Sequence, residues 1–185
     1  MKKSTKGALA VAAAGALLVG GGGSLAYWTG TATVGGAAIS SGTITLSTPD
    51  CTDSVPAGTH GWQFDGGDAF APATDKIVPG DTLTKVCNST LTMTGKHIGA
   101  TLALDSASFA TGGDANLKTA LNGATATVKV DGAAYAPITA PGTHTVQVTV
   151  TVPFPSGVSA DNTKAVSATL NDLTVTATQT HDTAS

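Results

Sequence analysis

The segment that decides the fold is residues 144–152, which read H-T-V-Q-V-T-V-T-V. Valine occupies every second position from 146 to 152, and His144 stands on the same parity at the start of the segment. Gln and Thr occupy the positions between the valines. Strict alternation of apolar and polar residues is typical of a strand with one buried face in an antiparallel sheet. The segment therefore predicts a long strand that contributes its valines to a hydrophobic core.

Alternation of this kind recurs along the chain. It predicts further strands at 43–47, 82–93, 98–104, 125–130 and 173–178. Turn sequences separate them, including Pro79-Gly80-Asp81, Gly112-Gly113-Asp114, Asp131-Gly132 and Pro141-Gly142. Many short strands between regular turns favour an all-β fold, specifically an antiparallel β-sandwich that is jelly-roll-like.

Local signals add one hairpin and one or two short helices. Asp131-Gly132 has the composition of a two-residue hairpin turn. Asp114 is suited to cap a helix from Ala115 to Leu121, and Ser159 a turn that runs to Lys164.

The composition excludes several classes of protein. The chain has 185 residues, only 11% of them charged, with a formal net charge of −3. Every acidic residue is Asp and every cationic side chain is Lys, and no basic patch is visible, which argues against nucleic-acid binding. Without Glu the chain has no H-E-x-x-H zinc-protease motif, and it also lacks the G-x-S-x-G motif of serine hydrolases. We therefore expect neither an enzyme nor a cofactor.

The first 26 residues have the layout of a cleaved signal peptide. Lys2, Lys3 and Lys6 precede an apolar run over 8–19, four glycines and Ser24-Leu25-Ala26. Cleavage is expected between Ala26 and Tyr27, although an uncleaved membrane anchor is the alternative. The mature chain, 27–185, would keep six Lys against twelve Asp, a net charge of −6. Such a protein would be secreted and would not bind membranes after cleavage.

The chain has two cysteines, Cys51 and Cys87. An even pair in an exported domain indicates first a disulfide bridge. Two free thiols or a metal-binding pair are the alternatives, but neither a C-x-x-C motif nor a neighbouring His supports a metal site.

A possible metal site is the segment 63–70, where Asp65 and Asp68 flank two glycines and Asp75 follows close by. Calcium prefers oxygen-rich loops of this kind, so these three carboxylates are weak calcium candidates. The simpler interpretation is a solvated turn between the apolar residues Trp62, Phe64 and Phe70.

The start of the mature chain has two interpretations. Residues 27–34 read Y-W-T-G-T-A-T-V, and one parity holds Trp28, Gly30, Ala32 and Val34. This segment is either an ordinary first strand of its own sheet or a donor strand that pairs with the sheet of another subunit. The pattern alone favours the ordinary first strand.

Several segments together resemble the TasA/camelysin family, whose members carry a SipW-dependent signal peptide. The resemblance depends on the Gly-rich end of the signal, the following aromatic pair, S-G-T-I-T-L at 41–46 and V-P-G-D-T-L-T-K at 78–85. The segment L-T-V-T-A-T-Q at 173–179 looks like the last strand of the family. The similarity covers both ends and the region near residue 80, and it thins over 105–165. Cys51 and Cys87 depart from the family's pattern.

The resemblance implies a secreted protein of Gram-positive bacteria that is cleaved by a signal peptidase of the SipW type. It implies a biofilm-matrix or cell-surface fibre, a head-to-tail homo-oligomer assembled by donor-strand complementation. An N-terminal donor strand, 27–38, would leave one subunit, and a single β-sandwich domain, 39–185, would accept the strand of the next. The expected subunit-interface residues are Tyr27, Trp28, Gly30, Ala32 and Val34. The alternative is a monomeric β-sandwich that binds carbohydrate or a surface protein.

Overall fold

A computed structural model describes residues 30–51, 61–65, 67–158 and 162–182 of the chain. The chain divides into two compact units, Met1–Ile39 and Ser40–Ser185. In the first unit, the described residues 30–39 are all exposed and belong to no helix or strand. Every strand of the described residues and both hydrophobic core clusters lie in the second unit, so this core is built without residues 30–39.

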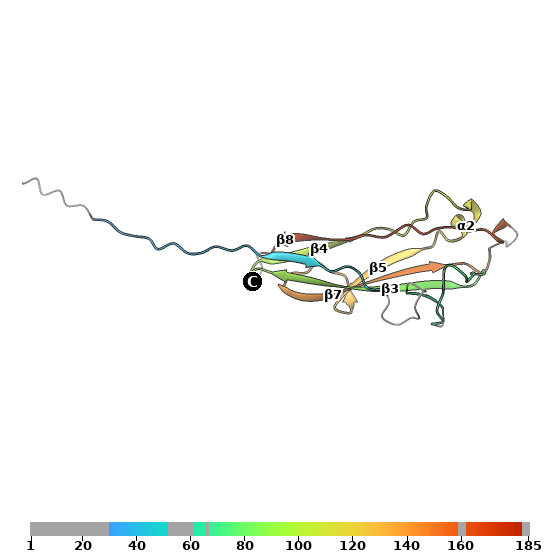
Figure 1. The fold of residues 1–185 in the computed structure, drawn as a ribbon, viewed down its shortest axis with the longest axis horizontal. Coiled ribbons are helices and arrows are strands. Elements are labelled where there is room, and N and C mark those ends of the chain that lie inside the picture. The colour runs from blue at the N-terminus through green and yellow to red at the C-terminus, as the bar shows by residue number, and fades with distance from the viewer. Residues whose placement is uncertain (1–29, 52–60, 66, 159–161, 183–185) are drawn as a thin grey trace, which may run out of the picture. The chain divides into compact units, whose positions relative to one another are not determined.

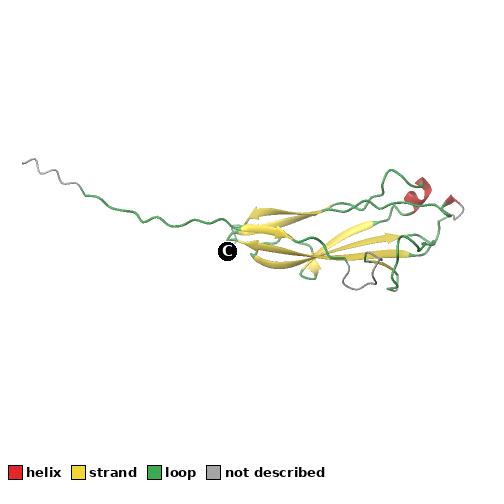
Figure 2. Ribbon diagram, viewed as in Figure 1, coloured by secondary structure: helices red, strands yellow, loops and turns green. Residues whose placement is uncertain are grey.

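The second unit is a sandwich of two antiparallel sheets (Figures 1 and 2). The larger sheet has the order β1-β3-β7-β5-β6, with β2 beside the start of β3. Its strands are β1 (Thr43–Leu46), β2 (Trp62–Phe64), β3 (Thr82–Thr94), β5 (Thr125–Val130), β6 (Ala133–Ala134) and β7 (Gly142–Pro153). The smaller sheet pairs β4 (Ile98–Leu104) with β8 (Val175–His181), and the helix α2 covers Ala115–Ala120.

The segment 144–152 lies in β7, which pairs along its whole length with β3. Val146, Val148, Val150 and Val152 are between 0% and 6% exposed, and the residues between them point outward. Val146 belongs to one core cluster and the other three valines to a second, so β7 joins both parts of the core. The predicted all-β antiparallel sandwich is therefore confirmed.

Two local predictions are also confirmed. Asp131 and Gly132 have φ angles of 51° and 80° and join β5 to β6 as a two-residue turn. Asp114 caps α2, because its carboxylate accepts a hydrogen bond of 2.8 Å from the main-chain N–H of Leu117. Ser159, the expected cap of the second helix, lies outside the described residues.

The structure differs from the sequence analysis at two strands. β8 begins at Val175 rather than at residue 173, because the Thr174 N–H donates to the side chain of Asp105 instead of to a regular ladder partner. β2 was not predicted, since three residues are too few for a period of two to be recognised. It forms because its residues pair with Leu83, Thr84 and Lys85 of β3.

Candidate functional site

One edge of the smaller sheet is closed by the chain between β6 and β7. Ala100 of β4 exchanges two main-chain hydrogen bonds, of 2.8 and 2.9 Å, with Ile138. Two residues further along β4, the Leu102 N–H donates to the hydroxyl of Tyr135 over 2.7 Å. Ile138 is 7% exposed and packs into the core. On the edge of β4 that faces away from β8, the crossing segment therefore supplies hydrogen-bond partners at Ala100 and Leu102.

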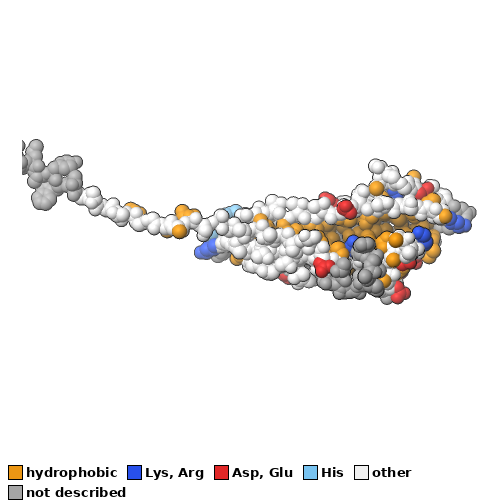
Figure 3. Space-filling model, in the orientation of Figure 1, with side chains coloured by type: hydrophobic (Ala, Val, Ile, Leu, Met, Phe, Trp, Pro, Cys, Tyr) orange, Lys and Arg blue, Asp and Glu red, His pale blue; other side chains and the backbone are white. Residues whose placement is uncertain are grey.

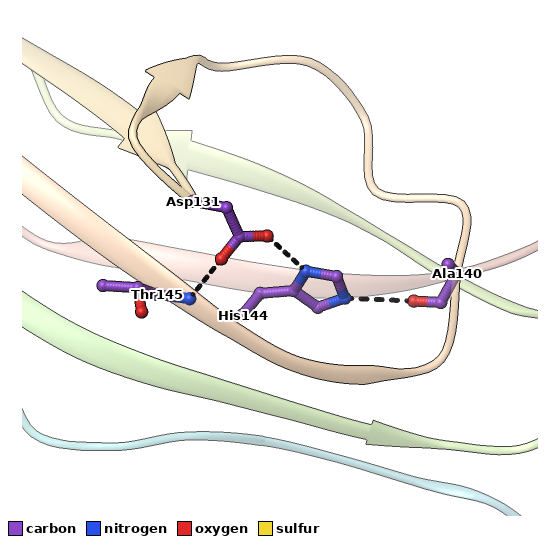
Figure 4. A network of polar contacts seen from close by, with 4 residues as sticks. All are labelled: Asp131, Ala140, His144 and Thr145. Carbon is purple, nitrogen blue, oxygen red and sulfur yellow. Dashed lines mark hydrogen bonds and ion pairs between the residues drawn. The ribbon is translucent and has the colours of Figure 1, made fainter.

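A polar network holds the crossing segment at both ends (Figure 4). His144 Nδ1 lies 2.8 Å from Asp131 Oδ2, and its Nε2 lies 3.2 Å from the Ala140 carbonyl oxygen. The other Asp131 oxygen accepts from the Thr145 N–H over 2.8 Å. The hydrogen bonds from His144 and from Thr145 hold the pKa of Asp131 below its ordinary value of 3.8. His144 thus bridges Asp131 and the Ala140 carbonyl, and it links the start of β7 to the crossing segment.

The opposite edge of the smaller sheet, along β8, is open. Along an antiparallel strand, the main-chain N–H and C=O groups of one residue point to the neighbouring strand on one side. Those of the next residue point to the opposite side. Thr174 O accepts from Asp105, and the Asp182 N–H donates to His97, so even-numbered residues face the β4 side. The main-chain groups of residues 173, 175, 177, 179 and 181 consequently face away from β4. Within the described part of the chain, no strand pairs with this outer edge.

A groove lies between the outer edge of β8 and β1. Its volume is about 480 Å³. It is lined by Ile44, Leu46, Ser47, Thr48 and Pro49 on one side and by the segment Leu173, Thr174, Val175, Thr176 and Ala177 on the other. On the face drawn in Figure 3, hydrophobic side chains form a band between the two layers of the sandwich. β1 also has no partner other than β3 among the described residues, so both walls of the groove carry strand edges that can accept a further strand.

One lysine of β3 is partly buried inside the sandwich. Lys85 is on the inward-facing parity of β3, with Leu83 and Cys87, and its ammonium lies 5.7 Å from the centre of the Trp62 ring. Burial lowers the pKa of Lys85, and the negative charge of Asp172 opposes that shift. Asp172 directly precedes Leu173 of the groove wall.

Of the expected interface residues, Gly30, Ala32 and Val34 lie in the described chain, and all three are exposed. Val34 is 92% exposed and Ile39 is 97% exposed, the two highest values among the large apolar side chains described. Ala26, Tyr27 and Trp28 lie outside the described residues.

The Cys51–Cys87 disulfide is present, as predicted. Cys87 is 8% exposed and lies on β3, whereas Cys51 follows directly after an isolated bridge between Asp50 and Asn88. The bond therefore fastens the chain that follows β1 to the middle of β3.

The calcium candidates do not form a recognisable metal site. Asp75 accepts from the Ala71 N–H over 2.7 Å and from the Thr74 hydroxyl over 3.2 Å, so it stabilises its own turn. Asp65 and Asp68 are exposed. Across residues 30–51, 61–65, 67–158 and 162–182, no group of three or more His, Cys or Asp side chains is arranged to hold a metal ion.

The open edge of β8 was missed by the sequence analysis. Alternation identified Leu173, Val175 and Ala177 as inward-facing residues, and all three are partly buried. It carried no information about which strands lie beside β8. Tyr135, Asp131 and His144 were missed as edge-closing residues because their partners are distant in sequence, and no local signal identifies them.

Among the described residues, no helix has the length and apolar character needed to cross a membrane. In the comparisons with known proteins, no family model, no curated protein and no solved structure matches this chain.

Proposed function

We propose that this protein is a secreted structural subunit, not an enzyme, that assembles into an extracellular-matrix or cell-surface fibre. In this proposal a signal peptidase of the SipW type cleaves after Ala26. Residues 27–38 of one copy then occupy the groove between β1 and β8 of the next copy. The observation that carries the proposal is the open edge of β8, which offers main-chain groups and an apolar floor together.

The contrast between the two edges of the smaller sheet supports this proposal. The outer edge of β4 is covered by Ile138 and Tyr135, whereas no described strand covers the outer edge of β8. Exposed strand edges invite pairing with other chains, and proteins normally cover or interrupt them. A second copy of the chain supplies the missing strand from a segment that is itself exposed and unpaired.

The dimensions and side chains of the two partners also agree. The edge 173–181 and the segment 30–38 are both nine residues long, about 30 Å at the rise of an extended strand. Gly30, Ala32 and Val34 share one parity and are small. They suit a narrow groove floored by Leu46, Val175 and Ala177, while the threonines of the other parity remain in contact with water.

The position of the N-terminal segment favours an open chain of subunits. Thr43 pairs with Thr94 at the end of β3, and His181 pairs with Ile98 at the start of β4, directly after the β3–β4 turn. The start of β1, at Thr43, therefore lies at the His181 end of the groove. A strand that enters a neighbour's groove from the opposite end, at Leu173, runs antiparallel to β8 and generates a head-to-tail filament.

The test is negative-stain electron microscopy of purified 27–185 beside a version that begins at Gly36. Filaments in the longer protein alone are the expected result. Monomeric particles in both versions, across salt and pH, would contradict assembly of this protein by itself and would favour the monomeric binding module. Filaments in both versions would show that assembly uses a surface other than the donor segment.

A further inference from the structure

One wall of the groove is a short segment that follows β1. Ser47, Thr48 and Pro49 line the groove directly. Towards β1, Ser47 is tied to β3, because its N–H donates to Thr90 O over 2.9 Å and its hydroxyl accepts from the Thr90 N–H over 2.8 Å. Towards Cys51, Asp50 and Asn88 exchange two main-chain hydrogen bonds of 2.7 Å. Four hydrogen bonds to β3 thus hold this wall.

The disulfide is the covalent part of this attachment. It joins Cys51, two residues after the groove-lining Pro49, to Cys87, the neighbour of Asn88 on β3. The next described pairing with β3 occurs at Trp62 of β2. Gly61 packs against the main chain of Cys51 so closely that a Cβ atom there would lie 1.9 Å from the Cys51 carbonyl oxygen. The bond therefore fixes the point where the groove wall ends and the chain departs toward β2.

We propose that the Cys51–Cys87 disulfide is a redox switch for the groove, which accepts the donor strand when the bond is formed and loses affinity when it is reduced. The inference rests on the proposed function and adds its regulation. Without the bond, the groove wall after the four-residue strand β1 is held to β3 only by the hydrogen bonds of Ser47 and Asp50. A donor strand must then order this wall as it binds, and ordering each residue costs about a factor of ten in affinity.

The chemistry of the switch is ordinary thiol–disulfide exchange. A dithiol reductant supplies two electrons and two protons, the Sγ–Sγ bond breaks, both cysteines become thiols, and the reductant becomes a disulfide. Cys51 is partly buried and Cys87 is 8% exposed, so Cys51 is the more accessible of the two residues that the bond joins. A chain synthesised in a reducing cytosol would therefore have a weakened groove, and assembly would begin only after export and oxidation.

The experiment measures binding of a fluorescent peptide of residues 27–38 to the 36–185 protein, by anisotropy. The protein is used oxidised, reduced with a dithiol, and as the double variant Cys51→Ser, Cys87→Ser. We expect the affinity to fall by about tenfold or more in the reduced protein and in the double variant. Reoxidation of the reduced protein should restore the affinity, whereas the double variant should not respond to oxidant.

A matched control separates the groove from general stability. Leu117→Ala removes a buried side chain of α2 that does not line the groove, so it lowers the melting temperature without changing the wall. Below its melting temperature this variant should bind the peptide as the parent does.

Equal peptide affinity in the oxidised and reduced proteins, both folded by circular dichroism, would overturn the redox switch. An equal loss of affinity in Leu117→Ala would overturn it too, because general destabilisation would then explain the loss. Absence of peptide binding by the oxidised protein is a different result, since it contradicts the donor-strand proposal itself.

Discussion

The two edges of the smaller sheet differ in whether other parts of the described chain bind their outward-facing main-chain groups. At the β4 edge, Ile138 and the Tyr135 hydroxyl satisfy main-chain groups of Ala100 and Leu102, and the Asp131–His144 pair holds the crossing segment. At the β8 edge, the described chain offers no strand at all, and an apolar groove remains. Within the described residues, three hydrogen bonds cover one edge and no strand covers the other, and this difference is the basis of the proposed acceptor groove.

This comparison predicts a separation of effects. Changes at the β4 edge should lower stability without altering assembly, because that edge is complete within one chain. Changes at the β8 edge should abolish assembly with little effect on the isolated subunit.

The largest effect is expected from a charge placed in the groove. Ala177→Asp introduces a carboxylate at a partly buried position that the donor strand must cover, and burying an unpaired charge is strongly unfavourable. Filaments of 27–185 should be lost in electron microscopy. The control is Thr178→Asp on the outer face of the same strand, which should still assemble. Filaments in Ala177→Asp would exclude the groove as the acceptor.

The next largest effect is expected at Ile138, which covers the outer edge of β4. Ile138→Ala removes most of a side chain that is 7% exposed in the core, at a cost of about 2–5 kcal/mol in the free energy of unfolding. Chemical denaturation measures this loss. Filaments should still form wherever the variant is folded, and their disappearance would show that the two edges are not independent.

A smaller effect is expected from Tyr135→Phe. The change keeps the ring but removes the hydroxyl that accepts from Leu102, leaving a main-chain donor without that partner. An unsatisfied buried donor costs about 1–3 kcal/mol. Denaturant unfolding should reveal this loss, and hydrogen exchange at the Leu102 amide should become faster. An unchanged exchange rate would mean that the hydroxyl does not protect this edge in solution.

The smallest effect is expected from Asp131→Asn, and it depends on pH. The folded state lowers the pKa of Asp131, so its ionised form contributes stability above the unfolded value near 3.8, and this contribution disappears as the pH falls through the folded pKa. The parent should melt at a higher temperature than the variant near pH 6, and the difference should shrink below about pH 4. A difference that stays constant over this range would assign the effect to geometry rather than to charge.

Much of this architecture could be predicted from local patterns. Period-two alternation reports which face of a strand is buried, so the valines of β7 and Leu102 of β4 were placed correctly. Asp114 and Asp131-Gly132 were also recognised, since a helix cap and a tight turn depend on a few adjacent residues. β2 and the limits of β8 were not recognised, because a three-residue strand and the ends of a strand are decided by pairing with residues distant in the sequence.

The sequence indicated the donor segment of the candidate site but not the groove. Residues 27–34 alternate in the same way as the core strands, yet the described residues 30–34 form no strand in this chain. Alternation measures the tendency to bury one face and says nothing about where the partner edge lies. The groove residues of β1 and β8 are more than a hundred positions apart, so no window of sequence contains both walls.

The sequence by itself indicated the all-β class, the buried face of strands such as β5 and β7, and a disulfide as the first choice for its two cysteines. Each of these depends on residue type at short spacing or on a choice among very few partners. Only the tertiary structure decided which edges are covered and which stay open, because edge satisfaction depends on long-range approaches such as that of Tyr135 to Leu102. The groove, its wall at Ser47–Pro49 and the position of the disulfide beside it follow from that arrangement and from no local pattern.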